Sequence, residues 1–218
     1  MRKLLLFSLL CMLLPVAAAA APEGACDGVT VGAADTAAYF PLLRGRRVAV
    51  LANQTSRVGD EHLVDLLHRS GVRLTAIFSP EHGFRGTADA GEHVASSVDE
   101  RTGVLIRSLY DGRTRRPSDE AMRSFDVLLV DMQDVGLRFY TYYISMLRMM
   151  DACADFGRAV VVLDRPNPNG SYIDGPVLDM KYKSGVGALP IPVVHGLTMG
   201  EIARMAVGEG WAKPCDLT

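Results

Sequence analysis

The chain of 218 residues has few cysteines and lacks the short motifs that mark common cofactor and metal sites. Its four cysteines form no Cys-x-x-Cys pair, and no Gly-x-Gly-x-x-Gly, Walker loop or His-Glu-x-x-His occurs. Basic residues are not in excess either, because 23 Lys and Arg face 25 Asp and Glu, which gives a net charge of −2. This charge balance argues against a protein that binds nucleic acids through their phosphates.

The N-terminus has the parts of a secretory signal peptide. Two basic residues precede an apolar run over 4–14, and an alanine tract follows over 17–21. A membrane anchor is the alternative, but the apolar stretch barely reaches spanning length and contains Pro15. We expect cleavage after Ala20 or Ala21, export to the periplasm or the extracellular space, and no stable membrane anchor.

Three segments are therefore expected: a signal peptide over 1–21, a leader over 22–44 and one α/β domain over 45–218. Loss of two basic residues with the signal leaves 21 basic against 25 acidic groups, a net charge of −4. The mature chain keeps Cys26, Cys153 and Cys215, an odd number that allows one disulfide but no disulfide framework. Its stability must come from a hydrophobic core.

The domain alternates short apolar runs with amphipathic segments. The runs that predict strands cover 46–52, 72–78, 104–109, 125–130, 159–163 and 191–194, and the predicted helices cover 60–70, 117–124, 139–156 and 198–207. Continuous apolar runs are typical of strands that are buried on both faces of a parallel sheet. The sequence thus predicts an α/β fold with a Rossmann-like, three-layer parallel sheet and helices on both faces.

Dense polar segments follow four of these predicted strands, over 53–55, 79–86, 131–142 and 164–170. Open parallel sheets bind ligands at the carboxyl ends of their strands. We therefore expect the four segments to meet at one edge and to form a pocket for a polar ligand. The alternative is that they merely connect the elements.

Glu81 is the sharpest candidate within these segments. Pro80 restricts the backbone before it, and Phe78 and Phe84 flank it, so its carboxyl group could be partly desolvated and act as a general acid. An exposed loop acid is the alternative. Glu92 is a second carboxylate that could enter the same pocket, although its position in the sequence alone favours a surface charge.

Asp131 and Asp134 follow another predicted strand and could bind a divalent cation. Arg138 stands close in sequence and would offset their negative charge. A structural salt bridge or a hydroxyl-binding acid is therefore favoured over a metal ligand, and we expect no metal site and no cofactor.

The remaining candidates have both a structural and a functional interpretation. Tyr140, Tyr142 and Tyr143 could stack on sugar rings, but the helical period lets only one or two of them face a cleft. His195 could line the pocket or be a satisfied loop histidine. Thr198 and Glu201 have the spacing of a capping box and are expected to be structural.

Five motifs together carry a resemblance to a known family. In order, they are Asn53-Gln54-Thr55, the segment 78–86 (Phe-Ser-Pro-Glu-His-Gly-Phe-Arg-Gly), the segment 133–142 (Gln-Asp-Val-Gly-Leu-Arg-Phe-Tyr-Thr-Tyr), the segment 163–168 (Leu-Asp-Arg-Pro-Asn-Pro) and the segment 195–201 (His-Gly-Leu-Thr-Met-Gly-Glu). They closely resemble the exo-β-N-acetylmuramidase family. The resemblance covers most of the chain from about residue 45 to 207.

The resemblance implies a glycoside hydrolase that releases N-acetylmuramic acid from the non-reducing end of peptidoglycan fragments. It also implies a smaller second α/β domain, most of it beyond Thr218, with the active site in the cleft between the two domains. The family's catalytic glutamate falls on Glu81. The other site positions fall on Asn53, His82, Arg85, Glu92, Gln133, Asp134, Arg138, Tyr140, Asp164, Arg165 and His195.

In the implied mechanism Glu81 protonates the glycosidic oxygen, while Glu92 or Asp134 activates water or attacks directly. The N-acetyl group of the substrate is a third possibility for the second group. An arginine, which offers a planar fork to carboxylates, would bind the lactyl carboxylate of muramic acid; Arg85, Arg138 and Arg165 are the candidates.

Two other functions fit the same residues. One is an exported sugar-binding module that lacks turnover because its second domain is absent. The other is a metal-dependent phosphohydrolase that uses Asp131 and Asp134.

Overall fold

The computed structural model describes residues 28–81, 83–84, 97–109 and 116–218. The predicted signal peptide, Cys26 and the candidates His82, Arg85 and Glu92 lie outside the described residues. The strands are β1 (Val48–Ala52), β2 (Arg57–Val58), β3 (Glu61–His62), β4 (Leu74–Ser79), β5 (Ser97–Val98), β6 (Leu105–Ser108), β7 (Val127–Asp131) and β8 (Ala159–Val162). The helices are η1 (Gly32–Ala34), α1 (Thr36–Leu43), α2 (Leu63–Arg69), α3 (Asp119–Arg123), α4 (Tyr142–Phe156), η2 (Met180–Tyr182) and α5 (Met199–Gly208).

The main sheet has six strands in the order β5-β6-β4-β1-β7-β8. All neighbouring pairs from β6 to β8 are parallel, and β5 alone pairs antiparallel, with β6. This arrangement confirms the Rossmann-like α/β fold that the sequence predicts. Because the parallel strands share one direction, their carboxyl ends all lie at one edge of the sheet.

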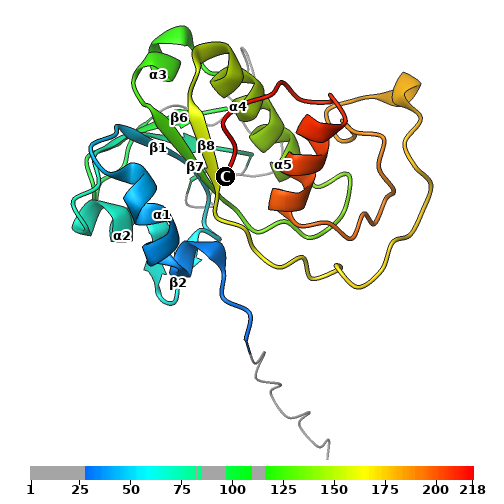
Figure 1. Cartoon of the computed structure of the whole chain (residues 1–218), viewed down its shortest axis with the longest axis horizontal. Helices are drawn as coiled ribbons and strands as arrows, with labels where there is room; N and C mark the ends of the chain where they lie inside the picture. The colour runs from blue at the N-terminus through cyan, green and yellow to red at the C-terminus, as the bar shows by residue number, and fades with distance from the viewer. Residues whose placement is uncertain (1–27, 82, 85–96, 110–115) are drawn as a thin grey trace, which may run out of the picture.

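Two hydrophobic cores lie on the two faces of the sheet (Figure 1). In β1, Ala49 and Leu51 pack in the core that contains α3, α4 and α5, whereas Val48, Val50 and Ala52 pack in the core that contains α1 and α2. Successive side chains of a strand point to opposite faces, so a strand covered on both sides needs apolar residues at every position. All five residues of β1 are fully buried, which explains the continuous apolar run.

The longest helix, α4, provides much of the first core. Its inward face carries Tyr143, Met146, Met149, Met150 and Cys153, all fully buried. The helix ends at a glycine in the left-handed conformation, which favours glycine because it has no Cβ.

The structured domain begins earlier than the sequence analysis expects. Within the segment assigned to a leader, Ala33, Tyr39 and Leu43 are buried in the second core. The backbone N–H of Gly32 donates to the carbonyl of Asp164 at 2.8 Å, and a Cβ at Gly32 would lie 2.7 Å from the Asp164 nitrogen. Residues 32–43 are therefore part of the α/β domain.

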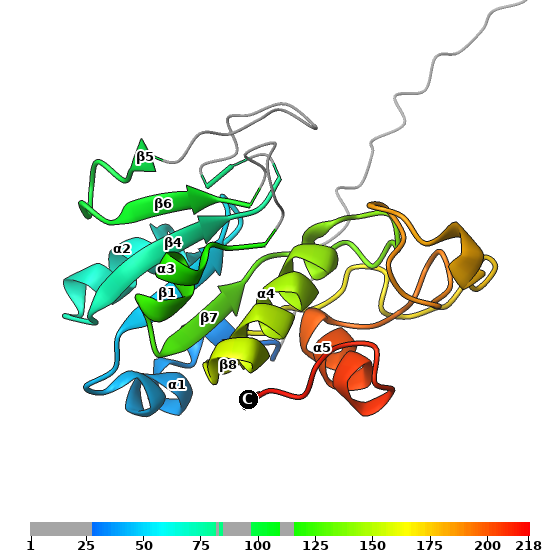
Figure 2. The ribbon, with the colours of Figure 1, turned by 90° about the horizontal axis from the view of Figure 1, so that it is seen from above.

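One predicted strand is wrong. Residues 191–194 do not join the main sheet; Val194 instead forms isolated antiparallel bridges with Leu137 and Asp174. They belong to the long segment 164–198, which forms a lobe beside α4 and α5 (Figure 2). A short apolar run cannot by itself distinguish a sheet strand from a buried extended segment.

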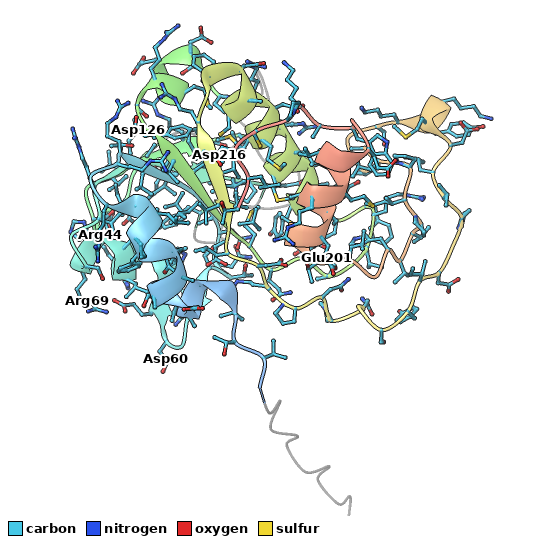
Figure 3. All side chains as sticks on the ribbon, in the orientation of Figure 1. Arg44, Asp60, Arg69, Asp126, Glu201 and Asp216 are labelled. Carbon is cyan, nitrogen blue, oxygen red and sulfur yellow. The ribbon has the colours of Figure 1, made fainter. Side chains whose placement is uncertain are left out.

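The last residues of the chain run along the outer edge of β8. The Val160 N–H donates to the Asp216 carbonyl at 2.7 Å, and the Thr218 N–H donates to the Val160 carbonyl at 3.0 Å. Asp216 accordingly lies beside β8 (Figure 3). Within the described part of the chain, no helix is long and apolar enough to cross a membrane.

Candidate active site

Hydrogen bonds join the loops after β1, β7 and β8 into one polar layer at the carboxyl edge. The Gln133 N–H donates to Thr55 Oγ1 at 2.9 Å, and the Gln133 side-chain amide donates to the Pro166 carbonyl at 2.8 Å. Asn169 Nδ2 donates to the Val135 carbonyl at 2.7 Å. Gln133, a predicted site residue, thus lies where the three loops meet.

Glu81 lies in the turn directly after β4 and is half-buried. Its Oε2 accepts a hydrogen bond of 2.8 Å from Thr141 Oγ1 at the start of α4. The two predicted apolar neighbours are both buried: Phe78 packs edge-on against Phe125, and Phe84 packs edge-on against His62. This hydrogen bond therefore links Glu81 to the beginning of α4, 60 residues away in sequence.

Asp134 and His195 form a buried pair. They are 3% and 2% exposed, and Asp134 Oδ1 lies 3.8 Å from His195 Nε2, too far for a hydrogen bond. The Gly136 N–H donates to Asp134 Oδ1 at 2.7 Å, whereas Asp134 Oδ2 and His195 Nε2 have no hydrogen-bond partner among the described residues. Buried polar atoms without partners are rare and costly, and they are characteristic of functional sites.

The surroundings of this pair determine its protonation. Burial raises the pKa of Asp134 to about 6, although the backbone N–H groups of Gly136 and Val135 act in the opposite direction. Burial also lowers the pKa of His195 below its ordinary value. His195 Nδ1 accepts from the Leu197 N–H at 3.2 Å, so a neutral ring carries its proton on Nε2, toward Asp134. A carboxyl group that titrates near pH 6 is suited to acid or base catalysis.

The raised pKa of Asp134 predicts how stability depends on pH. Between the unfolded pKa near 3.8 and the folded pKa of about 6, the folded state holds a proton that the unfolded state releases, so stability falls as pH rises through this window. Asp134→Asn has no such proton, so its free energy of unfolding relative to the native protein should rise by about 2 kcal/mol between pH 4 and pH 7. Urea unfolding at both pH values measures the gain, with Asp60→Asn as an exposed control; equal differences at the two pH values would contradict it.

Asp131 and Arg165 form a buried bidentate ion pair. Arg165 Nε donates to Oδ1 at 2.6 Å and Nη2 donates to Oδ2 at 3.0 Å, while the two side chains are 0% and 8% exposed. Burial raises the pKa of the Asp131 carboxyl, and the hydrogen bonds and charge of Arg165 oppose this shift. The carboxylate is thus engaged in the salt bridge that the sequence analysis favoured over a metal ligand. The residues that the structure describes contain no cluster of three or more potential metal ligands.

The sequence predicts that Arg138 offsets the negative charge of Asp131, but in the structure Asp131 pairs with Arg165 instead. Arg138 Nη1 donates to the carbonyls of Pro176 and Ile191 at 2.8 and 2.6 Å and so anchors the lobe formed by 164–198. Arg165 is the partner of Asp131 because β7 and β8 are adjacent and parallel, which brings the residues after both strands together.

Both carboxylate oxygens of Asp164 accept hydrogen bonds at the start of α5. Its Oδ2 accepts from Thr198 Oγ1 at 2.6 Å and its Oδ1 accepts from the Gly200 N–H at 2.9 Å. Thr198 and Glu201 form the predicted capping box, and Glu201 lies at the beginning of the helix (Figure 3). A Cβ at Gly200 would lie 2.7 Å from Asp164 Oδ2, so a side chain there would displace the Asp164 carboxylate.

Within the described chain, one polar atom of Asn53 has no hydrogen-bond partner, and Tyr140 is only half-buried. Asn53 is fully buried and its Oδ1 accepts from Thr55, but its Nδ2 has no partner among the described residues. Of the three neighbouring tyrosines, Tyr140 is half-buried, while Tyr142 and Tyr143 are in the core. Burial raises the pKa of Tyr140. Tyr140 is therefore the one member of the group that is partly exposed.

Two further residues of the polar layer, Thr141 and Asn167, are not among the predicted site residues. Thr141 contacts Glu81, and Asn167 Nδ2 donates to the Leu197 carbonyl at 2.9 Å. Gly136 has a φ of +76°, and a Cβ there would lie within 2.8 Å of three atoms of the Asn167 side chain. Thr141 and Asn167 both lie inside the motifs that carry the family resemblance. The motifs alone do not mark them as site residues; their contacts in the structure do.

The fold and its polar edge define a Rossmann-like α/β domain with buried acids where parallel strands end. The family model for the N-terminal part of exo-β-N-acetylmuramidase NamZ matches residues 48–218, and the chain belongs to this family. The chain is 45% identical over 183 residues to the peptidoglycan β-N-acetylmuramidase NamZ of Bacillus subtilis (strain 168), a match that covers 83% of this chain and 44% of that protein.

Two solved structures of DUF1343 family proteins from Bacteroides fragilis NCTC 9343 are also similar. They match with TM-scores of 0.77 and 0.79 at 55% and 38% sequence identity. Each match covers 86% of this chain, and 50% and 48% of the two solved chains respectively. The chain therefore spans about half the length of the relatives that it matches.

Proposed function

We propose that the chain belongs to an exported glycoside hydrolase that releases N-acetylmuramic acid from the non-reducing end of peptidoglycan fragments. The observation that carries the proposal is the position of Glu81, a half-buried acid at the carboxyl edge of the sheet whose carboxylate is held by Thr141. The named activity of the Bacillus subtilis relative supports the substrate class.

In this proposal Glu81 donates a proton to the glycosidic oxygen as the bond to the anomeric carbon breaks. General acid catalysis of this kind makes the departing sugar a better leaving group. Asp134, which is buried and titrates near pH 6, is the candidate for the second acid within the described residues. Glu92 and the substrate's own N-acetyl group remain the alternatives for that second function.

We propose Arg85 for the lactyl carboxylate of muramic acid. The two other candidate arginines are engaged within the fold, since Arg165 pairs with Asp131 and Arg138 anchors the lobe. If either arginine turned to bind the substrate, the polar groups that it now bonds would lose that hydrogen bond, which would cost free energy. Arg85 lies outside the described residues.

A direct assay tests the proposed function. The purified chain is incubated with an aryl N-acetylmuraminide and with a muramyl disaccharide, and release of the aryl alcohol and of free N-acetylmuramic acid is measured. A hybrid that continues after Thr218 with the unmatched part of the Bacillus subtilis relative is assayed in parallel. We expect release by the hybrid and by the chain, with the hybrid faster because a second domain would complete the cleft.

The outcomes separate the candidate functions. Binding of the muraminide by the chain without turnover, while the hybrid is active, would show that the chain alone is a sugar-binding module. Release of phosphate from an aryl phosphate that a chelator abolishes, with no release from the muraminide, would favour the metal-dependent phosphohydrolase. Folded proteins that neither bind nor hydrolyse the muraminide would contradict the proposal.

A further inference from the structure

The side chain of Thr141 is used differently from those of the other helix N-caps. At four of the α-helices in the described chain, the N-cap side chain accepts a hydrogen bond from the first turn: Asp35 at α1, His62 at α2, Ser118 at α3 and Thr198 at α5. Thr141 is the N-cap of α4, but its side chain makes no capping bond. Threonine is a favoured N-cap residue because its oxygen stabilises the free N–H groups there.

The hydroxyl of Thr141 instead donates to Glu81 Oε2 at 2.8 Å. While it donates, a threonine hydroxyl can still accept from a backbone N–H, as that of Thr198 does when it donates to Asp164. The hydroxyl of Thr141 accepts no such bond, and its bond is to a carboxylate 60 residues away in sequence.

The position of Thr141 makes this contact rigid. Threonine is branched at Cβ, which restricts its χ1 angle, and the following Tyr142 and Tyr143 are buried in the core. Glu81, in contrast, lies in a turn and has three rotatable side-chain bonds. A hydrogen bond from a fixed donor to such a side chain selects one of its orientations.

We propose that Thr141 is a positioning residue that holds the Glu81 carboxyl group in the orientation needed for proton donation. Oε2 accepts from Thr141, and Oε1 carries the proton that passes to the glycosidic oxygen. The bond from that oxygen to the anomeric carbon breaks, and its electron pair stays on the leaving sugar. This inference rests on the proposed acid role of Glu81.

Two substitutions at position 141 test the proposal. Thr141→Val keeps the shape and removes the donor, whereas Thr141→Ser keeps the donor. In the active protein, Thr141→Val should lower kcat by about ten- to a hundredfold, with KM changed less than about threefold, because a hydrogen bond to an acid group is lost from the reacting state. Thr141→Ser should retain kcat within about threefold of the native value.

A double-mutant cycle separates positioning from a general structural effect. If Thr141 acts only through Glu81, Thr141→Val should cause no further loss in a protein that already carries Glu81→Gln. A further loss as large as in the native background would overturn the proposal. Native activity of Glu81→Gln would instead refute the proposed function, whereas loss in Glu81→Gln with native kcat in Thr141→Val would refute the positioning alone.

A crystal structure of the Thr141→Val protein tests the geometry without turnover. The Glu81 carboxyl group should move or occupy more than one orientation, while the backbone of α4 stays in place. An unchanged, single orientation of the carboxyl group would overturn the proposal even if the protein showed no hydrolysis.

Discussion

Replacement of Glu81 by glutamine is expected to lower kcat for a muramyl disaccharide by about 10²–10⁴-fold, the usual contribution of general acid catalysis. Glutamine has the shape of glutamate and can still accept from Thr141, but it has no proton to donate to the leaving oxygen. Substrate should therefore still bind. The measurement is kcat and KM for the disaccharide in the chain or, where turnover is faster, in the hybrid.

The leaving group provides an internal control for this prediction. An aryl muraminide has an activated leaving group that barely needs protonation, so Glu81→Gln should cost much less with this substrate. Glu92→Gln and Asp134→Asn should slow both substrates if either residue is the nucleophile or base. Near-native turnover of the disaccharide by Glu81→Gln would exclude Glu81 as the acid and transfer the assignment to Glu92 or Asp134.

Replacement of Arg165 by methionine is expected to lower the free energy of unfolding by about 3–5 kcal/mol, since it leaves one charge of a buried pair without its partner. Asp131 is fully buried and both of its carboxylate oxygens accept from Arg165. Methionine approximates the length of the arginine stem, so the packing changes little. Urea unfolding at pH 7 measures the effect.

The expected loss depends on pH in a defined direction. Without Arg165, burial alone acts on Asp131 and raises its folded pKa further, so stability is lost as pH rises from the unfolded pKa through the folded one. The destabilisation should therefore be smaller at pH 4.5 than at pH 7.5. Adding Asp131→Asn to Arg165→Met removes the charge and should restore part of the stability; a loss below about 1 kcal/mol in the single variant would show that the pair is dispensable.

Much of the fold was predictable because local patterns are sufficient for it. The apolar runs at 125–130 and 159–163 predict strands buried on both faces, and β7 and β8 have that environment. The capping box at Thr198 and Glu201 is a local signal and is confirmed. The predicted strand over 191–194 failed because Ile191 is buried in the core that contains α4 while Val194 bridges Leu137 and Asp174, and sequence alone does not distinguish such burial from burial within a sheet.

The sequence by itself determined the α/β class, the family and the strand ends that carry the candidate residues, because periodicity and motifs depend on neighbouring positions. Only the tertiary structure decided which polar groups meet. Asp131 pairs with Arg165, 34 residues away, rather than with nearby Arg138, and Glu81 contacts Thr141, 60 residues away. These contacts follow from the strand order and from the placement of α4 against the sheet, which bring distant segments together at one edge. Burial then raises the pKa of Asp134 and leaves its Oδ2 without a partner among the described residues, an effect of the folded environment that no local pattern contains.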